Sequence, residues 1–131
     1  MLAPSEDLES TNENSLVYKL CYKKFSVLFC GDIEEKAERL LLDMYGDTLR
    51  ADVLKVPHHG SASATSDALL EAVQPQYAVI SSGEDRNLLP RYETLIRLAD
   101  HVIEIFRTDE NGGIAILTDS AETKIYTENG K

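Results

Sequence analysis

The first regular pattern of the chain is a pair of short apolar runs at residues 16–22 and 25–30. Only Lys23 and Lys24 lie between the two runs. Both runs are rich in β-branched and aromatic residues, and their short connection predicts an antiparallel hairpin. From residue 33 the apolar positions recur three and four residues apart. This spacing predicts an amphipathic helix, which Gly46 is placed to end.

The remainder of the chain alternates between short strands and helices. A second helix is expected at about residues 66–73, capped by Thr65 or Ser66, and a third is expected to open at Pro90. Further strands are expected at residues 53–56, 77–81, 102–106, 114–117 and 123–126, the last two after a turn at Gly112 and Gly113. Such a series predicts an α/β fold, a sheet with parallel pairs and flanking helices.

Length and composition predict one ordinary globular domain. The chain has 131 residues, of which 43% are apolar and 27% charged. Residues 1–13 are expected to form a flexible acidic lead-in, and residues 14–131 the domain. We expect a soluble chain, because it has no signal peptide and no apolar stretch of the roughly 18 residues that a membrane span needs. Cys21 and Cys30 are too few for a disulfide framework and are expected to be reduced.

The chain has 23 acidic and 13 basic side chains and a net charge of −10, which limits the kinds of binding partner that we expect. A broad nucleic-acid surface clusters Lys and Arg to replace counterions. Any contact with nucleic acid is therefore expected to be local.

Polar residues follow four of the predicted strands at the point where each strand ends. They are Gly31–Asp32, the stretch His58-His59-Gly60-Ser61, residues 81–85 and residues 107–109. Ligands of open α/β sheets bind outside the carboxyl ends of the strands, so these loops should converge on one edge. Carboxylate and imidazole groups there suit zinc or a similar divalent ion.

Two interpretations of these residues stay open. Asp32 and Glu35 have the spacing of a capping box, so Asp32 is either a helix cap or a ligand. His58 and His59 are either two exposed loop histidines or functional residues, and their position before Gly60 favours function.

Other polar residues are expected to be structural. Glu34 and Glu35 are expected on a solvated helix face, His101 in a connection, and Lys55 as a snorkelling or edge residue. Ser61 and Ser63 lack a separate His and acid pair spaced to activate them as nucleophiles.

Residues 14–17, 25–34, 51–61, 75–81 and 107–112 resemble the metallo-β-lactamase-like domain at the carboxyl end of the ComEC/Rec2 family of DNA-uptake competence proteins. The similarity covers about residues 14–119. Its most specific motifs are GDIE at residues 31–34 and LKVPHHGS at residues 54–61, in combination and at this spacing.

The resemblance implies a four-layer αββα fold with a hydrolytic site for two divalent ions, zinc or manganese. By position, Asp32 corresponds to the carboxylate that bridges the ions, His59 to a ligand of one of them, and His58 to a residue beside the substrate. Two such ions activate water and stabilise charge on a phosphoryl oxygen. The implied substrate is DNA or another phosphodiester. The implied parent is a bacterial membrane protein that carries this domain outside the membrane.

The chain departs from the family pattern in two places. It has no H-x-H-x-D-H motif, and with only His58, His59 and His101 it cannot form a two-metal site alone. Leu88-Leu89-Pro90 stands where the family has a His before Pro. We therefore interpret the chain as the carboxyl-terminal half of the domain, cut from a longer protein and inactive by itself. Its exposed half-domain surface predicts homo-oligomers or marginal stability.

A second hypothesis stays open beside the hydrolase. The chain would then be a non-catalytic structural or interaction module that keeps the metallo-β-lactamase scaffold. An upstream H-x-H-x-D-H sequence would favour the hydrolase, and replaced ligands would favour the module.

Overall fold

A computed structural model describes residue 8 and residues 10–83 and 88–130 of the chain. It opens with the predicted hairpin, in which β1 (Tyr18–Tyr22) pairs antiparallel with β2 (Phe25–Phe29). Cys21 lies opposite Ser26 in this register, and Cys21 and Cys30 are both free thiols, as expected.

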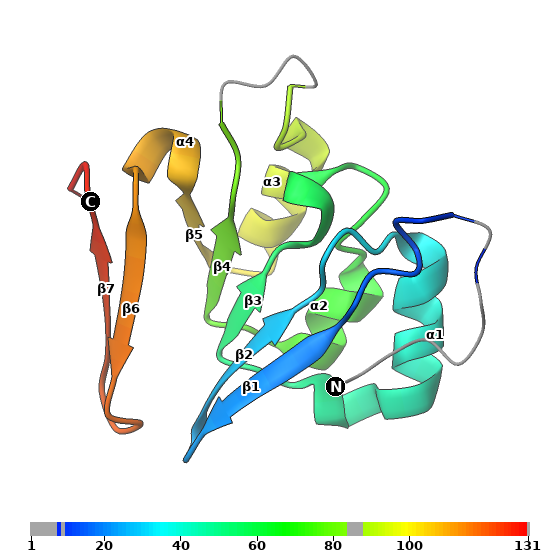
Figure 1. Cartoon of the computed structure of the whole chain (residues 1–131), viewed down its shortest axis with the longest axis horizontal. Helices are drawn as coiled ribbons and strands as arrows, with labels where there is room; N and C mark the ends of the chain where they lie inside the picture. Colours follow the sequence, from blue (N-terminus) through cyan, green and yellow to red (C-terminus); the bar gives the residue numbers. More distant parts are fainter. Residues whose placement is uncertain (1–7, 9, 84–87, 131) are drawn as a thin grey trace.

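Three parallel strands extend the hairpin into one five-stranded sheet. β3 (Val53–Lys55) pairs with β2, β4 (Tyr77–Ile80) with β3, and β5 (Glu104–Arg107) with β4, which gives the order β1-β2-β3-β4-β5 (Figure 1). A second sheet contains β6 (Ile114–Thr118) and β7 (Thr123–Thr127), paired antiparallel. The predicted α/β class with a mixed sheet is confirmed, and the arrangement is consistent with half of a metallo-β-lactamase fold.

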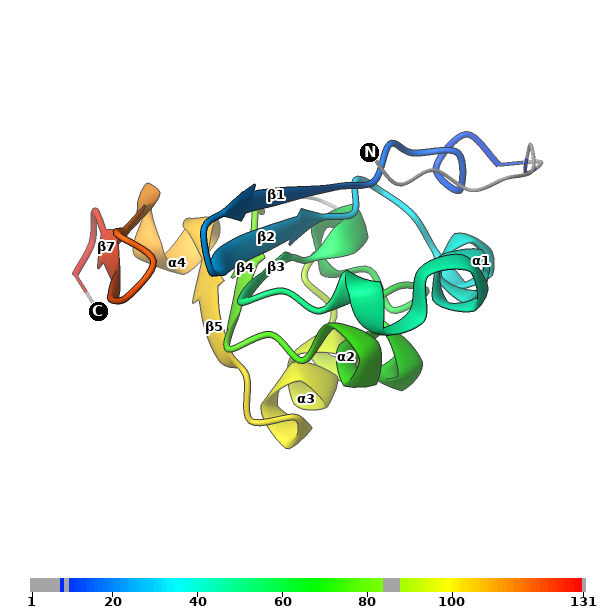
Figure 2. The same ribbon diagram turned by 90° about the horizontal axis from the view of Figure 1, so that it is seen from below.

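The long helices all lie on one side of the five-stranded sheet (Figure 2). They are α1 (Glu35–Tyr45), α2 (Asp67–Val73) and α3 (Tyr92–Asp100). Leu28, Leu54 and Ala78 share one register row of the sheet and belong to the buried core beneath these helices. Ser66 caps α2 by accepting a hydrogen bond from the Leu69 amide, one of the two predicted caps.

The opposite face of the sheet stays partly open. Tyr18, Leu20 and Tyr22, every second residue of β1, lie on this face and are 42%, 58% and 49% exposed. Tyr18 stacks on Phe29 of β2, with ring centroids 4.7 Å apart. An apolar sheet face normally packs against another layer, so this face has the character of one half of a sandwich.

Short helical segments add detail that the apolar pattern did not predict. Two 3-10 turns, η1 (Gly46–Leu49) and η2 (Pro57–Gly60), precede and follow β3, and α4 (Thr108–Asn111) follows β5. α3 begins at Tyr92, after Arg91 as its cap residue, rather than at Pro90. Periodicity cannot reveal segments of one turn, because they present too few apolar positions.

Two expectations concern the ends and the surroundings of the domain. None of the helices in the described part of the chain has the length and apolar character of a bilayer span. The flexibility expected for residues 1–13 falls largely on residues 1–7 and 9, which lie outside the described residues.

Candidate functional site at the carboxyl edge of the sheet

The polar loops converge at the carboxyl edge of the sheet, as the strand order predicts. His59, after β3, reaches the loop after β4, where its Nδ1 lies 2.7 Å from the Ser81 carbonyl oxygen. The next residue, Ser82, donates from its hydroxyl to Asp109 Oδ1 at 2.7 Å, after β5. Its amide also donates to Thr108 Oγ1 at 2.8 Å. Of the expected loop 81–85, residues 84 and 85 lie outside the described residues.

The turn that carries both histidines has an unusual backbone. His58 and His59 adopt the left-handed conformation with φ of 46° and 51°, and Gly60 follows with φ of 81°. Left-handed residues other than glycine are uncommon and cost free energy, and they concentrate at functional sites. A Cβ on Gly60 would lie 2.6 Å from Pro90 Cβ, so glycine is required there on two counts.

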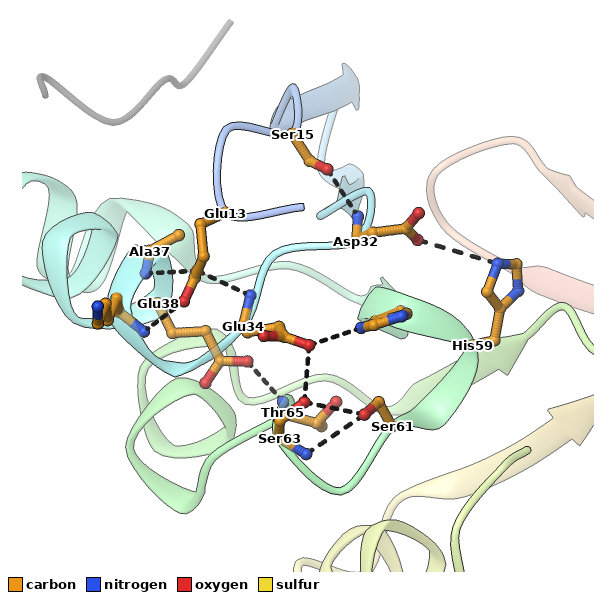
Figure 3. A network of polar contacts seen from close by, with 12 residues as sticks. Glu13, Ser15, Asp32, Glu34, Ala37, Glu38, His59, Ser61, Ser63 and Thr65 are labelled. Carbon is orange, nitrogen blue, oxygen red and sulfur yellow. Dashed lines mark hydrogen bonds and ion pairs between the residues drawn. The ribbon is translucent and has the colours of Figure 1, made fainter. Parts of the chain in front are cut away.

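Asp32 and His59 face each other across this edge (Figure 3). His59 Nε2 lies 3.9 Å from Asp32 Oδ1, and the two side chains are 49% and 46% exposed. A carbonyl oxygen only accepts, so His59 Nδ1 donates to Ser81, and in the neutral form of the ring Nε2 carries its lone pair on the side of Asp32. In histidines that bind metals, the ring nitrogen that does not contact the metal typically donates a hydrogen bond, as Nδ1 of His59 does here.

Glu34 and His58 form a closer pair beside the first one. His58 Nδ1 lies 2.9 Å from Glu34 Oε1, and Ser63 Oγ donates to the same oxygen at 2.9 Å. Both side chains of the pair are only about a quarter exposed, at 26% and 28%. The expectation that Glu34 lies on a solvated helix face is wrong, because its carboxylate turns back toward η2. Glu35 matches that expectation and pairs with Arg39.

Glu13 explains why Asp32 and Glu34 remain available to the two histidines. Its buried carboxylate accepts hydrogen bonds from the amides of Glu34, Lys36 and Ala37 at 3.0, 3.2 and 2.9 Å (Figure 3). These amides are the unpaired donors at the start of α1. The capping-box interpretation of Asp32 is therefore wrong, because a residue 21 positions before Glu34 supplies the cap.

Ser15 fixes the loop of Asp32 from the same preceding segment. Its hydroxyl accepts from the Asp32 amide at 3.1 Å, and its Cβ lies 2.8 Å from where a Cβ on Gly31 would stand. Gly31 has φ of 58°, a value that glycine adopts without strain. The segment before β1 thus shapes the loop after β2.

Glu38, one helical turn after Glu34, is the most buried carboxylate of this region. Its oxygens accept from the amides of Thr65 and Ser66 at 2.5 and 2.9 Å, which ties α1 to the start of α2. Burial raises the pKa of Glu38, although the hydrogen bonds from Ser66 and Thr65 and the charge of Arg97 oppose this.

Lys55 lies on β3, the middle strand of the sheet, so of the two expected roles the edge residue is excluded and the snorkelling residue stays open. Its ammonium donates to the Val56 carbonyl at 3.1 Å. Burial lowers its pKa, and the negative charge of Asp32 partly opposes the shift. The charge of Lys55 is thus held near the loop of Asp32.

A charged cluster lies where β5 ends and α4 begins. Arg107 Nη2 lies 2.5 Å from Asp109 Oδ2 and its Nη1 lies 2.7 Å from Glu110. The hydrogen bond from Arg107 lowers the pKa of Asp109, and the bond from Ser82 adds to this shift. His101 lies away from this edge, where it bonds to Asp67 Oδ1 at 3.0 Å, in keeping with a structural role.

Two atoms at this edge, Asp32 Oδ1 and His59 Nε2, fit part of a metal site. Two bonds of about 2.0–2.2 Å can bridge the 3.9 Å between Asp32 Oδ1 and His59 Nε2, and both atoms are acceptors that zinc or manganese binds. No group of three His, Cys, Asp or Glu able to hold a metal occurs among residues 8, 10–83 and 88–130. The pair therefore fits two ligands of an ion and leaves the remaining ligands to other residues.

The residues that sequence reasoning missed are Glu13 and the partner role of Glu34. Nothing near Glu13 in the sequence indicates a cap for a helix that starts after an intervening hairpin. Glu34 belongs to the GDIE motif, and that motif was the available signal for a role in the site.

Comparison with known proteins gives the relationships of the chain. No family model matches it. It is 36% identical over 116 residues to the ComE operon protein 3 of Bacillus subtilis, which covers 87% of the chain. It is 36% identical over 115 residues, 86% of the chain, to the competence protein ComA of Neisseria gonorrhoeae. The recombination protein 2 of Haemophilus influenzae is 36% identical over 106 residues, 80% of the chain.

These relatives are much longer than the chain. The matched segments make up 15%, 17% and 13% of the three proteins, respectively. The similarity thus concerns one segment of each relative, and it runs through most of the present chain. On this evidence the chain belongs to the ComEC/Rec2 family of competence proteins.

Proposed function

We propose that the chain is one half of a metal-dependent phosphodiesterase domain of a competence DNA-uptake protein and that it is inactive alone. The observation that carries this proposal is the Asp32–His59 pair, two oriented metal-binding groups 3.9 Å apart at the carboxyl edge of the sheet. The names of the relatives support a role in competence.

The residues of the chain divide the work at this edge. Asp32 and His59 would hold a divalent ion, which when bound activates water and stabilises charge on a phosphoryl oxygen. His58 donates from Nδ1 to Glu34, so its Nε2 remains free to donate to or accept from a substrate oxygen. The Glu34 hydrogen bonds to His58 and Ser63 hold that ring in place.

The open face of the sheet supports the half-domain part of the proposal. Tyr18, Leu20 and Tyr22 expose large apolar areas in a row, as expected where a second sheet of the same domain packs. The missing metal ligands would come from that second half.

The proposal is tested on the complete protein that contains this chain, by metal-dependent degradation of labelled DNA. Asp32→Ala should lower the rate about a hundredfold or more, because it removes a metal ligand and leaves the fold intact. Glu35→Ala is the matched control, since it removes an exposed carboxylate three residues away and should leave the rate unchanged. The 131-residue chain alone should show no activity.

Two results would contradict the proposal. Equal rates for Asp32→Ala and wild type would remove Asp32 from the reaction. A complete protein with no DNA hydrolysis in zinc or manganese would favour the non-catalytic module instead.

A further inference from the structure

A polar hollow lies at the edge of the sheet opposite the candidate site, where the parallel strands begin. Its volume is about 350 Å³, and it is bounded by the β1–β2 hairpin, the segment before β3 and the segment between α2 and β4. The charged and amide side chains that line it are Lys19, Lys24, Arg50, Asp52, Gln74 and Gln76. None of them belongs to the site at the carboxyl edge.

The charge of this hollow is opposite to that of the chain. Three basic residues line it, although the whole chain carries −10. Asp52 is its one carboxylate, and Oδ2 of Asp52 already accepts from the Ser26 amide at 2.7 Å and from the Ser26 hydroxyl at 3.2 Å. The lining therefore keeps a positive charge that attracts anions.

Two of the cations are available to a ligand. Lys24 and Arg50 are exposed, and within residues 8, 10–83 and 88–130 neither makes an ion pair. Four other cations of the chain, Arg39, Arg97, Arg107 and Lys124, each pair with a carboxylate. Lys19 is held in the wall of the hollow, where its ammonium donates to the Thr48 carbonyl at 3.0 Å.

We propose that this hollow binds a phosphate group, with Arg50 and Lys24 contacting its oxygens. The planar guanidinium of Arg50 matches the paired oxygens of a phosphate, and Lys24 adds a mobile point charge. Gln74 and Gln76 provide neutral amide donors beside them. The phosphate belongs either to a DNA backbone or to a free phosphate ion. This binding does not depend on hydrolysis at Asp32 and His59.

The test uses the 131-residue chain at low ionic strength with two probes, inorganic phosphate and a fluorescein-labelled oligothymidine. Binding of phosphate is followed by amide NMR shifts of residues 24–26, 50–52, 74 and 76, and binding of the oligonucleotide by anisotropy. The double variant Lys24→Gln/Arg50→Gln should weaken binding on the order of tenfold, because it removes two charge-assisted contacts. For the oligonucleotide, each lost phosphate contact should reduce the slope of log affinity against log salt by about 0.7. The loss of both contacts should therefore reduce the magnitude of this slope by about 1.4.

The matched control is Lys36→Gln/Lys124→Gln, which removes the same charge from α1 and β7 and should bind like wild type. A response to phosphate alone would assign the site to a free ion, and a response to the oligonucleotide alone would assign it to a backbone phosphate. Equal losses in both double variants, or no binding of either probe, would overturn the proposal. Loss of binding in Asp32→Asn would also overturn it, since that result places the anion at the other edge.

Discussion

Asp32–His59 and Glu34–His58 are two acid–histidine pairs made from the same two loops, and they differ in closeness and exposure. The first pair is 3.9 Å apart and about half exposed, whereas the second is 2.9 Å apart and about a quarter exposed. In the second pair the hydrogen bond already engages His58 Nδ1 and Glu34 Oε1, whereas in the first pair Asp32 Oδ1 and His59 Nε2 are too far apart to bond to each other and can both face a ligand. Under the proposed function, the inner pair, Glu34–His58, would orient His58, and the outer pair, Asp32–His59, would bind the ion.

The comparison extends to Glu38, whose burial is greater still. Glu38→Ala should lower the free energy of unfolding by about 3–4 kcal/mol, because the buried amides of Thr65 and Ser66 lose their acceptor and a cavity forms. Urea denaturation measures the change. If Glu38→Ala lowered the free energy of unfolding by less than Glu34→Gln does, this would contradict the expectation that the more buried carboxylate contributes more to stability.

The stability of the chain should be nearly as sensitive to a change in the turn that carries the two histidines. Gly60→Ala should cost about 3 kcal/mol, since the left-handed backbone is strained with a side chain and the new Cβ meets Pro90. Gly46→Ala is the matched control, with a positive φ and no atom within 4 Å of the added Cβ. Its cost should be about 2 kcal/mol, from the backbone conformation alone (φ 44°, ψ −126°). Equal costs would show that the contact with Pro90 does not constrain the turn.

Glu34→Gln tests the inner pair directly. The loss of an ionised acceptor for His58 and Ser63 should cost about 1–2 kcal/mol by urea denaturation. An unchanged free energy of unfolding would indicate that the Glu34–His58 pair does not support the site.

The pH dependence of stability should reveal Glu38. Its raised pKa means that the folded state holds the proton more tightly than the unfolded state, whose pKa is near the ordinary 4.5. Its contribution is therefore complete below pH 4.5 and is lost as the pH rises through the folded pKa. Glu38→Gln should remove this decline, as measured by denaturation at a series of pH values. A decline of the same size in the variant would assign it to other groups.

Asp32→Asn should have the smallest effect on stability. The pair is too long for a hydrogen bond and is half exposed, so the change should stay within about 0.5 kcal/mol. A loss equal to that of Glu34→Gln would erase the distinction between the two pairs.

Much of the fold follows from local pattern, and the site does so only in part. The hairpin, α1, α2 and the strand ends are predictable because apolar spacing and cap residues are local signals. The cap from Glu13 and the turning of Glu34 toward His58 are not, because both depend on contacts over 21 and 24 positions of sequence. The left-handed backbone conformation of His58 and His59 is equally impossible to predict from the sequence, since histidine has no requirement for a left-handed turn.

The central claim, that Asp32 and His59 hold a divalent ion, is tested most directly by titrating the chain with Mn²⁺ and recording amide NMR spectra. The paramagnetic ion should broaden the amides of residues 31–32 and 58–60 first. This effect should vanish in Asp32→Asn and persist in Glu35→Gln. Broadening spread evenly over the acidic surface, or unchanged broadening in Asp32→Asn, would contradict the claim.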